Sequence, residues 1–160
     1  MDMATRDAGT IFSQNQVINA LSQVSSFWID FFDPSHQISQ AVKAPHLHVR
    51  VNQLFTGAFN TLTIFFQDAA QGAGQTGPNA APGVFENVFS TIAIPKADLF
   101  PGNDLLIVQI PNTGGLIGLG QVPFQPDTLS DSPLQRYVQF LYVCDAVPAT
   151  GSLDSWLQIF

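Results

Sequence analysis

The sequence has few charged residues and almost no cysteine. Asp, Glu, Lys and Arg make up 11% of the 160 residues, against about 25% in an average soluble domain, so the surface must be largely neutral. Buried charges need partners, and the centres of protein interfaces are depleted in them. A neutral surface therefore favours a protein whose outside is covered by other proteins. Cys144 is the only cysteine, which excludes an internal disulfide.

Basic residues and long apolar runs are also scarce. Five Lys and Arg stand against twelve Asp and Glu, which gives a formal charge of -7. The chain thus has no basic footprint for phosphate groups, and nucleic acid is not expected as a partner. No apolar run approaches the roughly 20 residues that a membrane-spanning helix needs, and no export signal is recognisable at the start. We expect a soluble protein that is not exported and is made in a reducing cytoplasm.

A sustained helical pattern is missing as well. Only residues 14–24 are ambiguous, between a short helix and a weak first strand at residues 16–21. Elsewhere apolar and polar residues alternate with the period of a strand, so that Leu47, Val49 and Val51 would face inward from the segment HLHVRVN. Strands are expected at residues 25–32, 46–52, 59–67, 85–94, 105–110, 136–143 and 153–159.

The residues between these strands support one fold class. Eleven Pro and twelve Gly fall mostly between the expected strands, where they favour turns. We therefore predict a single all-β domain over residues 1–160, an antiparallel two-sheet sandwich with the topology of a jelly roll of about eight strands and long loops.

Three segments lie outside this pattern. Residues 1–12 are expected as an N-terminal arm, and the Gly- and Ala-rich residues 69–83 as a long flexible loop between two strands. Residues 111–133 form a longer and more apolar loop, whose large side chains are poor choices for a solvated loop. We expect these side chains to contact a core or a partner: Leu116, Ile117, Leu119 and Phe124.

The strand near the C-terminus lacks the polar face of a half-exposed strand. Tyr137, Leu141 and Val143 would lie on one face, with Phe140 and Tyr142 on the other. One face must pack between the sheets. The other is expected to meet a loop, a second copy of the chain or a partner, which makes Tyr137 and Tyr142 candidate contact residues.

The chain also lacks an evident catalytic constellation. Gly72, Gly74 and Gly77 match G-x-G-x-x-G, but Pro78 cannot open the helix that would hold a phosphate. The carboxylates form no evident acid/base pair, and Cys144 has no histidine near it in the sequence. We expect no enzymatic activity and no cofactor.

Two other functions stay open. His46 and His48 project from the same face of a strand, as in metal-binding jelly rolls of the cupin kind, although Arg50 shares that face and would repel a cation. Trp28, Trp156, Tyr137 and Tyr142 could form an aromatic platform for sugar rings, although aromatic residues in strands are more often core. The alternatives are therefore a carbohydrate-binding module for host recognition and a metal-dependent, cupin-like enzyme.

Three stretches of the chain follow one another in a recognisable order. They are IFSQNQVINA with SSFWIDF near the start, STIAIPKADLFPGNDLLIVQIP in the middle and QRYVQFLYVCDAVPATGSLDSWLQ at the end. Their order and spacing resemble those of the small cement, or decoration, proteins of tailed-bacteriophage capsids, a jelly-roll family. The residues that carry the resemblance are Phe12, Ser13, Gln16, Ile18, Ser25, Ile29, Asp30, Ile94, Pro95, Leu99, Gly102, Pro111, Arg136, Tyr137, Tyr142 and Gly151.

This resemblance implies a structural virion protein, made in the host bacterial cytoplasm. It would bind the outer surface of the capsid, bridge neighbouring major capsid subunits and stabilise the shell. The implied partners are the phage major capsid protein and further copies of this chain, as a dimer or trimer. The sparse charge fits this role, because the role requires broad contact and no reactive group.

Overall fold

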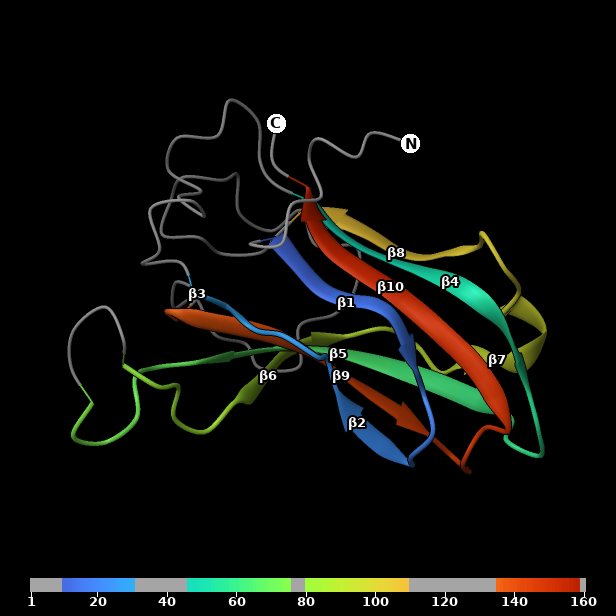
Figure 1. The fold of residues 1–160 in the computed structure, drawn as a ribbon, viewed down its shortest axis with the longest axis horizontal. Helices are drawn as coiled ribbons and strands as arrows, with labels where there is room; N and C mark the ends of the chain where they lie inside the picture. Colours follow the sequence, from blue (N-terminus) through green and yellow to red (C-terminus); the bar gives the residue numbers. More distant parts are fainter. Residues whose placement is uncertain (1–9, 31–45, 76–79, 110–134, 159–160) are drawn as a thin grey trace.

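The computed structural model describes residues 10–30, 46–75, 80–109 and 135–158. Two antiparallel sheets pack face to face with the core between them (Figure 1). Sheet A has the order β1-β10-β4-β8, from Ile11–Val17, Thr150–Gln158, His46–Thr56 and Asp104–Gln109. Sheet B has the order β2-β9-β5-β6, from Ser22–Val24, Tyr137–Cys144, Thr61–Ala69 and Glu86–Ser90.

Two short strands complete sheet B. β3 (Ile29–Asp30) pairs with β9 beyond β2, and β7 (Ile94–Pro95) pairs with β5 beyond β6. Each of these pairs of short strands thus acts as one interrupted strand. Counted this way the ten strands become eight, and their pairing order is that of a jelly roll.

The predicted fold class is therefore confirmed: the domain is an all-β, antiparallel two-sheet sandwich. A short 3-10 turn at Lys96–Asp98 is the one helix that lies wholly within the described ranges. None of the described residues belongs to a helix that could cross a membrane.

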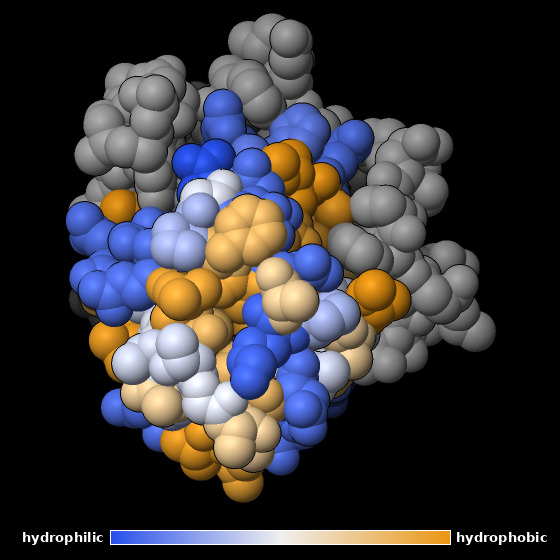
Figure 2. All heavy atoms as spheres, turned by 90° about the vertical axis from the view of Figure 1, so that its right-hand side faces the viewer, coloured by the Kyte–Doolittle hydropathy of each residue, from blue (hydrophilic) through white to orange (hydrophobic). Residues whose placement is uncertain are grey.

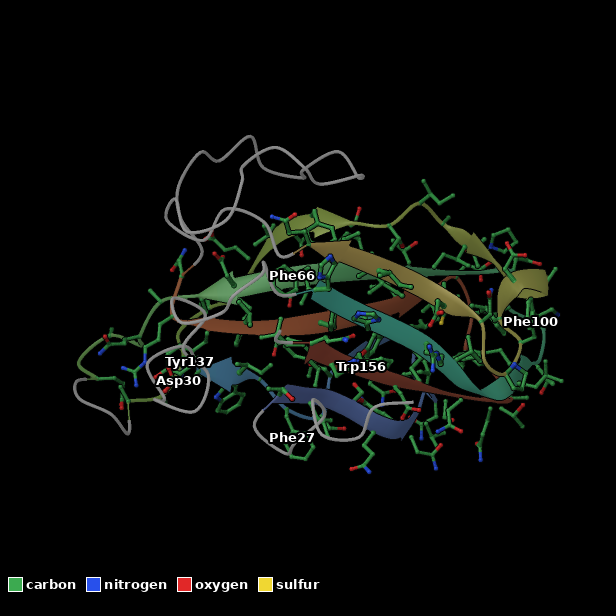
Figure 3. The ribbon with its side chains drawn as sticks, turned by 90° about the horizontal axis from the view of Figure 1, so that it is seen from above. Phe27, Asp30, Phe66, Phe100, Tyr137 and Trp156 are labelled. Carbon is green, nitrogen blue, oxygen red and sulfur yellow. The ribbon has the colours of Figure 1, made fainter. Side chains whose placement is uncertain are left out.

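The core is built from the inward positions of the alternating strands. In β4 the predicted residues Leu47, Val49 and Val51 are buried, because side chains of a strand point alternately to its two faces. Aromatic rings fill the centre: the Phe140 ring lies 4.9 Å from the Phe12 ring, between their centroids, in an edge-to-face contact that joins the two sheets. Phe66, labelled in Figure 3, lies 5.5 Å from the same ring.

The start of the chain differs from its pattern. Residues 14–24 form no helix, because β1 ends at Val17 and β2 follows. Of the strand expected at residues 25–32, residues 25–28 are not strand, because the Ser25 hydroxyl donates a hydrogen bond to the Phe27 carbonyl at 2.9 Å and sets a local turn. Ile29–Asp30 form β3, and residues 31–32 lie outside the described residues. A similar side-chain bond, from Thr91 to the Ile92 carbonyl at 2.8 Å, lies where the strand expected at residues 85–94 divides.

The Gly- and Ala-rich segment joins β5 to β6, as expected, but its described parts are hydrogen-bonded to each other. The Gly72 amide donates to the Ala81 carbonyl and the Gly83 amide to the Ala70 carbonyl, each at 2.8 Å. Ala80 is buried. Of the other two predicted segments, the N-terminal arm is described only from Thr10, where it already runs into β1, and residues 111–133 lie outside the described residues.

Tyr142 joins the sheets through a buried polar cluster. Its hydroxyl, on β9, lies 2.9 Å from the Ser13 hydroxyl on β1 and 2.7 Å from the Ser155 hydroxyl on β10. Ser13 donates its proton to Gln16 Oε1 at 2.6 Å, so Tyr142 donates to Ser13 and accepts from Ser155. Full burial raises the pKa of Tyr142 to about 12, so the hydroxyl stays protonated.

A first prediction concerns Gly151, which has a φ of +138° and lies so close to Phe55 that an added Cβ would be 2.4 Å from the Phe55 Cγ atom. Gly151→Ala should lower the free energy of unfolding by about 2 kcal/mol or more, through backbone strain and overpacking. Gly102→Ala is the control, because Gly102 has a φ of +84° and nothing within 4 Å of the added Cβ. It should cost only the strain, about 1 kcal/mol. Equal losses in urea unfolding would contradict the clash.

A second prediction concerns Tyr142. Tyr142→Phe should lower the free energy of unfolding by about 1–3 kcal/mol, because Ser155 loses the acceptor of its bond. Adding Ser155→Ala to that variant should cost less than Ser155→Ala costs in the wild type, which a double-mutant cycle measures. If the two losses simply add, the hydroxyl cluster is not a coupled unit.

The same tyrosine predicts a loss of stability in alkali. An unfolded tyrosine ionises near pH 10, before the buried one with its pKa of about 12, so stability from this group is complete below pH 10 and falls as the pH rises to 12. Tyr142→Phe lacks this titrating group, so its free energy of unfolding should fall less steeply with pH, by the amount that one proton contributes. Urea midpoints measured from pH 8 to about 11.5 provide the test.

Candidate binding surfaces

One end of the outer face of sheet B is covered by the chain itself. Tyr137 on β9 is 1% exposed, and its hydroxyl donates to the carbonyl oxygen of Ala80. The Arg136 guanidinium carbon lies 4.9 Å from the centre of the Tyr137 ring. Beside it, Gln139 donates to Gln67 Oε1 at 2.9 Å, and both amides are buried. This part of β9 therefore contacts a loop of the same chain.

These burials correct the predicted contact residues. Tyr137 lies under the chain's own loop and Tyr142 is 0% exposed between the sheets, so neither presents a side chain to a partner. We remove both from the candidate contact surface. The other four predicted contact residues lie outside the described residues: Leu116, Ile117, Leu119 and Phe124.

The rest of the outer face of sheet B is uncharged and partly exposed. Two cross-strand rows run over β2, β9 and β5: Val24–Leu141–Phe65 and Ser22–Val143–Thr63. We call these six residues the sheet-B face. Val24 is 48% exposed and the side chains on β9 and β5 are half-buried. A solvated sheet face normally carries polar and charged side chains, so this face has the composition of a contact surface.

The outer face of sheet A has a different character. Arg50 on β4 binds Asp104 on β8 at 2.7 Å between Nε and Oδ1, and Asp154 on β10 lies opposite Arg50. Arg50 also lies 5.5 Å from the centre of the Trp156 ring. Figure 3, which looks down on sheet A, places Trp156 over this face. Stacking on His48, with ring centroids 4.9 Å apart, helps to leave Trp156 only 4% exposed.

The histidines of this face are arranged as packing groups. The His46 and His48 rings are 6.4 Å apart between centroids, and His48 is stacked on Trp156. Arg50 shares the face, as the sequence predicts, and adds a positive charge. The described ranges contain no group of three His, Cys, Asp or Glu side chains placed to hold a metal ion.

Charged groups elsewhere are used inside the fold. Arg136 forms a two-pronged bond with Asp30, at 2.8 and 2.9 Å, and Lys96 donates to the Gly57 carbonyl at 2.7 Å. Asp145 accepts the backbone amides of Asn60 and Thr61, which lower its pKa. Each described basic side chain thus has a partner within the domain.

Two other acidic groups are buried. Desolvation raises the pKa of Asp68, although its carboxylate accepts the Gln135 amide at 3.0 Å. Burial also raises the pKa of the Cys144 thiol to about 11, so the thiol stays protonated and unreactive at neutral pH.

Phe27 and Trp28 form an exposed aromatic pair between β2 and β3, 55% and 52% exposed. The backbone of Phe27 is held in place, because its amide donates to the Phe12 carbonyl at 2.9 Å and its carbonyl accepts the Ser25 hydroxyl. Of the two tryptophans considered as a sugar platform, only Trp28 is therefore exposed. The sequence alone pointed to Trp28 as a candidate for binding sugar but not to Phe27. An aromatic residue in an expected strand is usually part of the core, so the exposure of Phe27 was not predicted.

A second set of exposed apolar side chains lies at one end of the sandwich, near the β4–β5, β8 and β9–β10 connections. Figure 2 looks onto this end and shows apolar patches among hydrophilic side chains. The large ones are Leu54, Phe100 and Val147, each about half exposed. Phe100 lies at the opposite end of the molecule from Tyr137 (Figure 3).

A fourth prediction concerns the two tryptophans and tests whether Trp28 is exposed and Trp156 buried. In Trp156→Phe the remaining Trp28 should emit at long wavelength and be quenched readily by acrylamide, because its ring is in water. In Trp28→Phe the remaining Trp156 should emit at shorter wavelength and be quenched several-fold less. Similar quenching of the two variants would contradict the burial of Trp156.

No protein-family model matches this chain, and no curated protein matches its sequence.

Proposed function

We propose that this protein is a structural virion protein, a cement protein that binds the outer surface of a phage capsid and bridges neighbouring major capsid subunits. The observation that carries the proposal is the pair of large aromatic side chains, Phe27 and Trp28, exposed on a sparsely charged sandwich. The resemblance of the chain's segments to capsid cement proteins supports it from the sequence side.

The distribution of charge supports this role. The basic side chains and several carboxylates of the described residues are engaged within the domain. Docking would therefore remove few free charges from water, which is the main cost of burying a polar surface. This low cost favours broad contact with another protein. It does not favour binding to an anionic polymer, because the described basic side chains are already engaged within the domain.

Phe27 and Trp28 have the properties of an interface centre. Aromatic side chains, Trp above all, contribute a large share of binding energy at protein interfaces. Here the backbone of Phe27 is held by hydrogen bonds at both its amide and its carbonyl. Less conformational entropy is then lost on binding than with a loose loop. A subunit seated across a seam adds contact area that must be broken before capsid subunits separate, and many copies add their effects.

A fifth prediction tests this contact. The double variant Phe27→Ala, Trp28→Ala should bind shells assembled from the major capsid protein of the same genome about tenfold more weakly, or worse. Co-sedimentation of the protein with purified shells measures this. Phe100→Ala, which removes an exposed ring elsewhere, is the matched control and should bind as the wild type does. Unchanged binding by the double variant would show that these rings are not the contact.

Exposure of the same pair also favours the carbohydrate-binding alternative, because an exposed aromatic ring can stack on a sugar. That function predicts that the wild-type chain binds host glycans on an array and that Trp28→Ala loses the binding. Glycan binding lost in this variant, with no association between wild-type protein and shells, would replace the cement role with the sugar-binding one.

A further inference from the structure

We propose that the sheet-B face is where a second copy of this chain docks, so that two sandwiches associate back to back through Ser22, Val24, Thr63, Phe65, Leu141 and Val143. The proposal deepens the cement role, and its biological meaning rests on that role. The contact itself is argued from the side chains and charges of this face alone.

Electrostatic repulsion limits where two copies can meet. Each chain carries a formal charge of -7, so two copies repel one another, and the repulsion is smallest where the touching surfaces carry no charge. The sheet-B face carries no charged side chain in either of its two rows. Contact through these two rows therefore buries no charged side chain of the face itself. The nearest carboxylate along the chain from β9 is that of Asp145, two residues beyond Val143, and it is held by the Asn60 and Thr61 amides.

The side chains of the face are also of kinds that can pair with themselves. In a two-fold symmetric contact a residue near the axis meets its own copy. A Ser or Thr hydroxyl both donates and accepts, so it can bond to an identical hydroxyl. Leu141, Val143 and Phe65 offer apolar surface, and its removal from water against the same surface of a second copy favours association. The face is thus chemically complementary to itself.

The outer face of sheet A fails the same comparison. A symmetric contact there would bring Asp104 and Asp154 of the two copies towards each other, and Arg50 is already engaged by Asp104. Like charges set against each other across an interface cost several kcal/mol. Of the two outer faces, the face of sheet B is therefore the one that suits a second copy.

The burial of the outward residues of β9 also points to this face. β9 lies inside sheet B, between β2 with β3 on one side and β5 on the other. Its outward residues divide into two parts: Tyr137 and Gln139 are buried under contacts of the same chain, while Leu141 and Val143 remain half-buried. The uncovered part is the apolar one, which the docking of a second copy would cover.

The test is the mass of the full-length protein in solution. Light scattering at about 100 µM should give twice the chain mass of 17.3 kDa, since contacts of modest area have micromolar affinities. The dimer should persist or tighten from about 0.05 to about 0.5 M salt, because salt screens the repulsion between the copies. Dissociation by salt would overturn the proposal.

A charge exchange at Leu141, in the apolar row of the face, makes the test specific. Leu141→Glu and Leu141→Lys should each be monomeric under these conditions, and an equal mixture of the two should form dimers again. The control is Ile107→Glu, which places the same charge at an exposed apolar residue on the outer face of sheet A. It should remain a dimer. Circular dichroism and the melting temperature establish that each variant is folded.

Several results would overturn the proposal. A wild-type monomer at about 100 µM would do so, as would a dimer that persists in folded Leu141→Glu. If the wild type is monomeric and Leu141→Glu loses shell binding, the face belongs to the capsid contact instead. The dimer needs no shell, so a salt-resistant dimer that fails to co-sediment with shells refutes the cement role alone and leaves this inference standing.

Discussion

The Tyr142 hydroxyl, bonded to Ser13 and Ser155, fixes how the two sheets meet. Three polar groups lie in an apolar interior, where each would cost about 1–3 kcal/mol if left without a partner. They are satisfied only when β9 of sheet B faces β1 and β10 of sheet A at this register. Apolar packing around them tolerates small shifts, but the hydrogen bonds do not. The cluster therefore selects one arrangement of the sandwich, and the aromatic contact of Phe12 with Phe140 packs beside it.

This arrangement determines what the surfaces present. With the inward side chains of β9 held between the sheets, the alternate ones must point outward, although most are apolar. The chain covers one part of them with its own loop, through Tyr137 and Ala80. Leu141 and Val143 are left as part of a neutral face. The use of the few charges as internal ties, such as Arg136 with Asp30, keeps that neutrality.

Several side chains that could carry chemistry have structural roles in the described part of the chain. Cys144 is buried with a raised pKa, the histidines of sheet A pack around Trp156, and Asp145 holds the turn before β5. Each of these groups thus has a role within the fold. The exposed aromatic side chains Phe27 and Trp28 are available for contact with a partner.

The sequence by itself determined the fold class, because the period of two in segments such as HLHVRVN depends only on the alternation of side chains along a strand. It also determined that charge would be scarce and the surface neutral. Tertiary structure decided which apolar residues are covered. Tyr137 and Trp28 look alike as aromatic residues in expected strands, yet one lies under a loop and the other in water. The difference arises from partners distant in the chain, Ala80 for the first and a local turn at Ser25 for the second. Local pattern cannot encode such contacts, since burial depends on what a side chain meets and not only on the face from which it projects.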